Sequence, residues 1–272
     1  MGAENNTKEI LVDSAKELAK EVYSDIAKST IKSIGNIISL PFKAIDAALT
    51  PIKKWIDKKN FNYEKTRELL AEKLKNTNET QIVEPEAYVA VPALQQLSYS
   101  YDSEDLRQLY ANLLASSMIE DTKWNVHPSF VEIIKQLSPA DARAMNVINN
   151  PEYLTVMTLA IREIKTDTYI NLIKNYSVDL IGLYPDDQQL SSSLENLQRL
   201  GLININYNVM VRPDSKYEPY ETDPLFSKIR DYFKDNKENE MAYKKGLIEL
   251  TDFGISFCKI CCTKEDSEVK NA

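Results

Sequence analysis

One stretch of the chain, from Pro85 to Ile148, limits the fold most strongly, because it contains no glycine and carries apolar residues at helical spacing throughout. The leucines of DLRQLYANLL recur at intervals of three and four residues, which places them on one face of an α-helix. Farther along, Ser138 and Pro139 form a helix start, since a capping hydroxyl is followed by proline at the first helical position. The middle of the chain is therefore predicted to be a bundle of helices.

The last third of the sequence has a different pattern. Gln188 to Leu200 is predicted to be a helix that ends on Gly201, which we interpret as a left-handed cap. The following residues, LININYNVMV, alternate between apolar and polar and are predicted to form a strand. A long insertion, Tyr207 to Lys245, contains a further predicted helix, Pro224 to Lys234. This order of elements resembles a winged helix. We therefore predict a mainly α chain, in which a helical N-terminal and central bundle is joined to a winged-helix-like α+β C-terminal part.

The patterns divide the 272 residues into four parts. Residues 1–60 are predicted to be N-terminal helices, and residues 61–150 a central helical domain. Residues 151–262 are predicted to be the winged-helix-like domain with its long insertion, and residues 263–272 a disordered tail. The low glycine count, 6 in the whole chain, agrees with a mostly helical interpretation because glycine is needed mainly in tight turns.

Charge is unevenly distributed along the chain. The formal net charge is -8, but between Ile26 and Lys59 seven lysines against two aspartates leave +5, so the remainder holds -13. In the same stretch isoleucines recur at helical spacing, and the lysines gather on the opposite side. Pro41 and Pro51 interrupt the pattern, because each removes a backbone donor. We call residues 26–59 the basic segment.

Three interpretations of the basic segment remain open. In the first, the segment is a helix on an anionic membrane surface, with the apolar side chains in the interface and the lysines at the headgroups. In the second, it is an ordinary helical hairpin packed on the core, which shows the same amphipathic pattern. In the third, it is an oligomer contact. The candidate residues for membrane or partner contact are Lys28, Lys32, Ile34, Ile38, Phe42, Lys43, Ile45, Ile52, Lys54 and Trp55.

Two consecutive motifs in the middle of the chain, DLRQLYANLLASSM and PSFVEIIKQLSPADA, resemble a known family. The matching residues are Leu106, Leu109, Tyr110, Leu113, Leu114, Ala115 and Met118, then Pro128, Ser129, Phe130, Glu132, Ile133, Ile134, Lys135, Gln136, Leu137, Ser138, Pro139, Asp141 and Ala142. The pair is similar to the abortive infection alpha (Abi-alpha) family of bacterial phage-defence proteins, with Tyr110 where tryptophan is common. The resemblance implies a role in abortive infection, in which an infected cell stops growing or dies before phage release, and it implies no catalytic residues.

Catalytic and metal-binding patterns are missing from the sequence. It has no Gly-rich phosphate loop, no G-x-S-x-G elbow and no H-E-x-x-H pair. The single histidine, His127, precedes Pro128 and is interpreted as flanking a helix start. Cys258, Cys261 and Cys262 follow a helical stripe and lack a fourth zinc ligand, so we interpret them as buried structural thiols, with metal binding, redox chemistry and acylation as open alternatives. We expect no cofactor and no enzyme activity.

Nucleic acid is a disfavoured partner. An acidic chain repels a duplex, and residues 186–200, which would form the recognition helix of a winged helix, carry three acids against one arginine.

Clustered cysteines and a polar N-terminus, MGAENNTKEI, favour a cytoplasmic protein, which would be peripheral on the inner face of the membrane if the basic segment binds lipid.

The sequence supports one leading function and two alternatives. In the leading hypothesis the chain is an abortive-infection-type phage-defence protein that acts by binding or by membrane contact. The first alternative is an interaction module that senses a phage or host factor without membrane contact, and the second is a winged-helix DNA-binding regulator. The expected partners are an anionic membrane surface, a phage or host protein, and a second copy of the chain.

Overall fold

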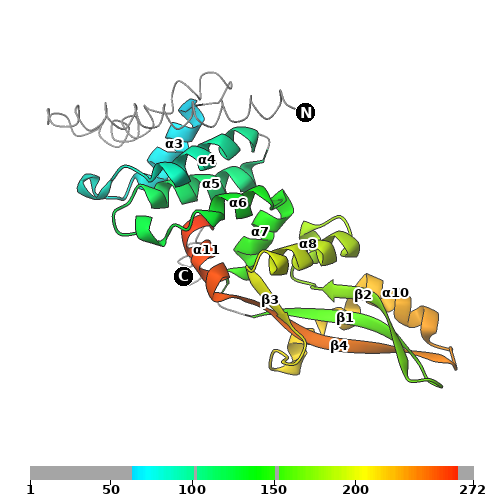
Figure 1. The fold of residues 1–272 in the computed structure, drawn as a ribbon. Coiled ribbons are helices and arrows are strands. Elements are labelled where there is room, and N and C mark those ends of the chain that lie inside the picture. Colours follow the sequence, from blue (N-terminus) through cyan, green and yellow to red (C-terminus); the bar gives the residue numbers. More distant parts are fainter. Residues whose placement is uncertain (1–62, 101–102, 151–152, 263–272) are drawn as a thin grey trace, which may run out of the picture.

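The computed structural model describes residues 63–100, 103–150 and 153–262. Helices gather at one end of the molecule, and a four-stranded sheet lies at the other end (Figure 1). One cluster of buried apolar side chains runs through both ends. The helices and the sheet therefore form one packed body.

The helical layer surrounds a central helix, α5 (Glu104–Ser117), which contacts the five other helices of the layer. These are α3 (Tyr63–Leu74), α4 (Ala87–Tyr99), α6 (Ser129–Lys135), α7 (Pro139–Ile148) and α11 (Asp252–Cys261). Leu109, Leu113 and Leu114 lie on the buried face of α5, as the leucine spacing predicted. The chain thus returns at its C-terminal helix to complete the layer (Figure 1).

The start of α7 confirms the predicted helix cap. Ser138 Oγ accepts a hydrogen bond from the Asp141 amide at 3.1 Å, and the Asp141 carboxylate accepts one from the Ser138 amide at 2.8 Å. This reciprocal pair satisfies two backbone donors that have no partner within the helix. Short 3₁₀ turns, η1 (Glu79–Gln81) and η2 (Lys123–Asn125), connect the neighbouring helices.

The sheet is antiparallel, with the strand order β2-β1-β4-β3. Its members are β1 (Leu154–Glu163), β2 (Thr168–Tyr176), β3 (Ile203–Asn206) and β4 (Asn239–Leu250). The two central strands, β1 and β4, pair along ten residues, from Leu154 opposite Ile248 to Glu163 opposite Asn239. A 3₁₀ turn, η3 (Ile181–Leu183), leads from β2 to α8 (Asp187–Arg199), which contacts β2 and β3 and ends before Gly201 at φ 73°, the predicted left-handed cap.

The predicted fold class, a mainly α chain with a winged-helix-like C-terminal part, is wrong. The four-stranded sheet makes the fold α+β, and β1 and β2 precede α8, where we predicted no strand. Residues 155–160 of β1 are all buried, so side chains on both faces of the strand are covered. A strand covered on both faces lacks the apolar and polar alternation by which a strand is recognised in a sequence.

The chain between β3 and β4, residues 207–238, is called the insertion from here on. The last part of the predicted insertion, residues 239–245, belongs to β4 instead. It forms η4 (Asp214–Tyr217), α9 (Pro219–Thr222) and α10 (Pro224–Phe233), and α10 confirms the predicted extra helix. The insertion packs against one side of the sheet, while α8 packs against the other (Figure 1). The sheet is therefore the middle of three layers, and the space between the sheet and the insertion is where the candidate site lies.

Candidate functional site

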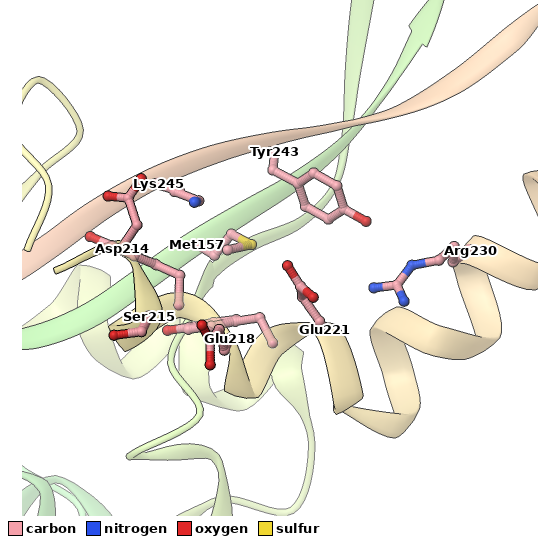
Figure 2. A pocket seen from close by; sticks show the side chains of 10 residues that line it. Met157, Asp214, Ser215, Glu218, Glu221, Arg230, Tyr243 and Lys245 are labelled. Carbon is pink, nitrogen blue, oxygen red and sulfur yellow. The ribbon is translucent and has the colours of Figure 1, made fainter. Parts of the chain in front are cut away.

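A pocket of about 450 Å³ lies between the sheet and the insertion (Figure 2). The sheet contributes Met157 from β1 and Tyr243 and Lys245 from β4, and the insertion contributes the opposite wall. That wall consists of Asp214, Ser215, Tyr217, Glu218, Tyr220, Glu221 and Arg230. Because Met157, Tyr217 and Tyr220 are buried, the floor is apolar and aromatic, and the charged side chains form the rim.

The acidic side of the rim is a helical stripe. Asp214, Glu218 and Glu221 are separated by four and three residues along η4 and α9, which brings their side chains to one face of the turns. The Glu221 carboxylate extends toward Tyr243 of the sheet, and Arg230 of α10 points toward Glu221 (Figure 2). The insertion thus places carboxylates along the whole length of the pocket.

The basic side chains lie at the two ends of the pocket. The Lys245 ammonium lies 5.1 Å from the centre of the Tyr217 ring, close enough for a cation–π contact. Asp214 is paired with Arg212, whose Nη1 lies 2.6 Å from Asp214 Oδ1. Among the described residues no ion pair within 4 Å joins Glu218, Glu221 or Arg230 to another side chain. These three charges are therefore available to a ligand.

Two buried tyrosines fix the insertion to the sheet beneath the pocket. The Tyr217 hydroxyl donates to the Gly246 carbonyl oxygen at 2.7 Å and accepts from the Val211 amide at 3.0 Å. The Tyr220 hydroxyl lies 3.1 Å from Thr155 Oγ1. Burial raises the pKa of both phenols, so they remain protonated donors. The floor is therefore held by hydrogen bonds as well as by apolar contact.

A third link joins the insertion to the edge of the sheet. The Tyr176 hydroxyl of β2 donates to Asp223 Oδ2 at 2.7 Å, and the other oxygen of that carboxylate caps α10 by accepting from the Leu225 amide at 2.9 Å. The Tyr176 ring also packs against the Phe226 ring, with centroids 5.2 Å apart. Tyr176 thus helps to set the position of α10, together with Tyr220 and Tyr243, whose rings also pack against Phe226.

The residues singled out in the sequence lie elsewhere. His127 flanks the start of α6, as predicted, because its Nδ1 accepts from the Ser129 amide at 3.2 Å. Cys258 and Cys261 of α11, and Cys262 directly after it, are buried free thiols. Burial raises the pKa of Cys261 well above its usual range. Their predicted burial is confirmed. Within the described ranges, no group of three or more His, Cys, Asp and Glu side chains is placed to hold a metal ion.

The candidate contact residues of the basic segment are Lys28, Lys32, Ile34, Ile38, Phe42, Lys43, Ile45, Ile52, Lys54 and Trp55, and all lie outside the described residues. The predicted tail, 263–272, lies outside them as well. In the described part of the chain, no helix combines the length and the apolar character needed to cross a bilayer. The sequence analysis did not predict the pocket. The feature of the sequence that could have indicated it is the helical spacing of Asp214, Glu218 and Glu221 in the insertion.

The fold and the pocket define an α+β protein with a ligand-sized site between its sheet and an insertion. Residues 58–261 match the family model described as abortive infection alpha, so the chain belongs to that family and the resemblance of its middle motifs is confirmed. Membership of this family indicates abortive-infection-type defence. The first 57 residues, which include nearly all of the basic segment, lie outside the match.

Other comparisons add little to this assignment. A search of the curated proteins finds no match. Among solved structures, an uncharacterized protein from the hydrocarbon-degrading marine bacterium Alcanivorax borkumensis SK2 is similar at 14% sequence identity, over 53% of this chain and 96% of that one, with a TM-score of 0.33. A similarity of that size supports no argument about this fold or its site.

Proposed function

We propose that this chain acts in abortive-infection defence by binding a partner polypeptide, without catalysis, and that the pocket between the sheet and the insertion receives that partner. The observation that carries the proposal is the pocket rim, where Glu218, Glu221 and Arg230 have no ion-pair partner among the described residues. Exposed charges around an apolar floor are typical of recognition sites, in which apolar contact supplies affinity and charge supplies specificity.

The chemistry of the walls indicates the kind of ligand. An apolar floor made by Met157 and two tyrosines suits an aliphatic or aromatic side chain. Carboxylates on one wall and Arg230 at one end suit flanking groups of both charges. A volume of about 450 Å³ falls within the range of small-ligand sites. A short peptide segment with an apolar side chain between charged neighbours meets all three requirements.

The same features favour protein over nucleic acid as the partner. Three carboxylates on one wall repel phosphate groups. The helix α8 would read DNA in the regulator hypothesis, but its Leu190, Leu194 and Leu197 lie in the core. Asp186 caps this helix and Asp187 begins it, so its exposed start is acidic. Membrane contact by the basic segment stays a prediction from the sequence, because those residues lie outside the described part of the chain.

Phage plating on bacteria that express the intact chain or a pocket variant tests the proposal. The variant combines Glu218→Arg with Glu221→Arg, which reverses the acidic wall but leaves the tyrosine floor intact. We expect protection to fall at least about tenfold, because the reversed wall brings like charges against the basic groups of the ligand, which costs on the order of a few kcal/mol.

The matched control combines Glu195→Arg on α8 with Asp235→Arg after α10, two exposed acids that do not line the pocket. It changes the net charge by the same amount and should protect like the intact chain. Circular dichroism and thermal unfolding establish that all three proteins fold. Equal protection by the pocket variant and the control would contradict the proposal.

A further inference from the structure

The hairpin of β1 and β2 leaves an apolar strand uncovered at the edge of the sheet. Strand β2 pairs with β1, and its other edge has no strand partner among the described residues. Thr168 to Leu172 are consecutive exposed residues of this strand, while Ile173 and Tyr176 at its other end are buried. The hairpin turn lies at the end of the sheet farthest from the helical layer (Figure 1). This end of β2 is therefore open on both faces and along one edge.

Large apolar side chains are concentrated on the hairpin. On β2, Tyr169 is 57% exposed, Ile170 67% and Leu172 44%, and Ile164 in the connecting turn is 47% exposed. Tyr169 and Ile170 are neighbours on a strand, so they lie on opposite faces of the sheet. An apolar edge strand is a template for pairing, because its free N–H and C=O groups can bond another strand and its side chains lose water on contact. The hairpin therefore has the features of an interface.

The straight part of the free edge is short. From Thr168 to Asn171, each residue of β2 has one partner on β1, but Leu172 is an extra residue that forms a bulge. A bulge bends the strand and interrupts the ladder of hydrogen bonds. At the other end, Asp167 precedes the strand with φ 55°. A partner strand can therefore align only with Thr168 to Asn171, which leaves few possible registers.

The charges at the two ends of β2 are complementary. Residues 168–173 carry no charge, so identical strands do not repel each other there. Lys174 is exposed and forms no ion pair within 4 Å in the part of the chain that the structure describes. The hairpin end, in contrast, has a net charge of -2, from Glu163, Asp167, Glu238 and Glu240 against Arg162 and Lys165. In an antiparallel pair of these strands, the lysine end of each lies beside the acidic end of the other.

We propose that the free edge of β2 pairs antiparallel with the same edge of a second copy of the chain, around a two-fold axis through Ile170. A two-fold dimer uses the same patch on both copies, and antiparallel pairing is the arrangement that such an axis produces between two strands. In this register Ile170 lies opposite its own copy and Tyr169 lies opposite Asn171. Each Lys174 lies opposite Thr166, in the acidic hairpin end. The two sheets then form one continuous sheet.

The exposed area is sufficient for such a dimer. Covering the four apolar side chains and the strand backbone buries on the order of 500 Å² per copy, so the pair buries on the order of 1,000 Å², near the lower limit of specific interfaces. We therefore expect a dimer that dissociates on dilution. None of the hairpin side chains lines the pocket between the sheet and the insertion, so the dimer and the proposed function can fail separately.

Sedimentation velocity of the full chain over a range of micromolar concentrations tests the proposal. We expect the mass to rise from that of one 31.1 kDa chain towards twice that value. Ile170→Lys should raise the dissociation constant of the dimer at least about tenfold, because two ammonium groups then face each other across the axis. Since Ile170 is exposed in the single chain, the variant should fold normally, which circular dichroism checks.

The matched control is Val209→Lys, an equivalent change at an apolar side chain that is 52% exposed and lies outside the hairpin. It should leave the dissociation constant unchanged. A chain that stays monomeric at every concentration would overturn the proposal. So would a dimer that both variants weaken equally, or that Ile170→Lys does not weaken, because self-association would then use another surface.

Disulfide formation provides a second measurement, which decides the matter if Ile170→Lys fails to fold. Opposite residues of an antiparallel pair have Cα atoms about 4.5–5.5 Å apart, within the range of a disulfide. Under mild oxidation Ile170→Cys should therefore cross-link to its own copy. Tyr232→Cys, at a position on α10 that is 80% exposed, should not, and the native cysteines are buried. No cross-link from Ile170→Cys, or equal cross-linking of the two variants, would overturn the proposal.

Discussion

The helical layer and the insertion bury their aromatic side chains in different ways. In the helical layer, Phe130 and Phe257 meet edge to face, with centroids 5.4 Å apart and no polar atom to satisfy. In the insertion, Tyr217 and Tyr220 are equally buried, but each hydroxyl reaches an oxygen of the sheet. Burial of apolar area has no direction, whereas a hydroxyl needs an acceptor at a defined place. Buried area therefore holds these two phenylalanines, and directed hydrogen bonds additionally hold the two tyrosines of the insertion. Tyr110 is the buried aromatic residue of the helical layer that behaves like the insertion tyrosines, because its hydroxyl donates to the Val131 carbonyl oxygen at 3.4 Å.

The largest loss of stability is expected from Phe130→Ala, which tests whether buried area holds the helical layer. The ring is 1% exposed at the centre of the helical layer, so its removal leaves a cavity and should lower the free energy of unfolding by about 4 kcal/mol. Urea unfolding followed by circular dichroism measures the change. As the control, Trp124→Ala removes a ring of the same layer that is 76% exposed, and it should cost no more than about 0.5 kcal/mol. Similar losses in the two variants would contradict an area-based account of the layer.

The second largest effect is expected where α11 of the helical layer crosses the start of β3. A Cβ on Gly254 would lie 1.9 Å from the Leu202 carbonyl oxygen, a backbone atom that cannot move aside without shifting the strand. Gly254→Ala should therefore lower the free energy of unfolding by about 3 kcal/mol. At Gly182 an added Cβ meets nothing within 4 Å, so Gly182→Ala is the matched control. A folded Gly254→Ala protein as stable as the control would mean that this contact is adaptable.

A smaller effect is expected at Asp141, which links the helical layer to α8. This residue is 4% exposed, and its carboxylate accepts hydrogen bonds from the Ser138 amide, the Ser193 hydroxyl and the Tyr184 hydroxyl. Asp141→Asn turns one acceptor into a donor and should cost about 2 kcal/mol in unfolding experiments. Asp186→Asn is the control, because asparagine and aspartate cap a helix about equally well. An Asp141→Asn protein with an unchanged free energy of unfolding would show that this hydrogen-bond network adds no stability beyond apolar packing.

The smallest effect isolates the directed hydrogen bonds of the insertion. Tyr220→Phe keeps the buried ring and removes the hydroxyl that lies 3.1 Å from Thr155 Oγ1, so it should cost about 1 kcal/mol. Tyr232→Phe changes a ring that is 80% exposed and should have no measurable effect. If chemical denaturation gives equal stabilities for the two variants, the hydroxyl does not help to hold the insertion.

Alkaline pH provides a second measurement on the same tyrosine. Burial raises the pKa of Tyr220 above the ordinary value of 10.0. The stabilisation that follows is complete below pH 10 and is lost as the pH rises further, because the unfolded chain ionises first. Phenylalanine does not ionise, so the stability difference between Tyr220→Phe and the intact chain should shrink as the pH rises from about 10 to about 11. A constant difference in denaturation midpoints across that range would contradict the assigned burial of the phenol.

Sequence reasoning succeeded where one local pattern decides the structure. The leucines of α5, the Ser138 cap of α7, Gly201 and the extra helix α10 were all predicted, because each depends on periodicity or on a single capping residue. The burial of the cysteines followed from the helical stripe of α11. These are features that neighbouring residues determine among themselves.

The candidate pocket could not be predicted in the same way. Met157 and Lys245 are 88 positions apart in the chain, and they lie opposite each other only because β1 pairs with β4. The acidic stripe of the insertion has a helical spacing that is visible in the sequence, but nothing in that spacing shows which surface it faces. Pairing across the sheet and the tyrosine anchors together place the two walls.

The sequence by itself determined the helices of the middle, their caps, the burial of the thiols and the family, because these depend on spacing within short stretches. The tertiary structure decided that the fold is α+β, that the insertion packs against the sheet, and that acidic and basic side chains share one pocket. The physical reason is the burial of β1 on both faces. A strand covered by helices on one side and by the insertion on the other has no alternation to reveal it, and the residues that cover it are distant in the chain.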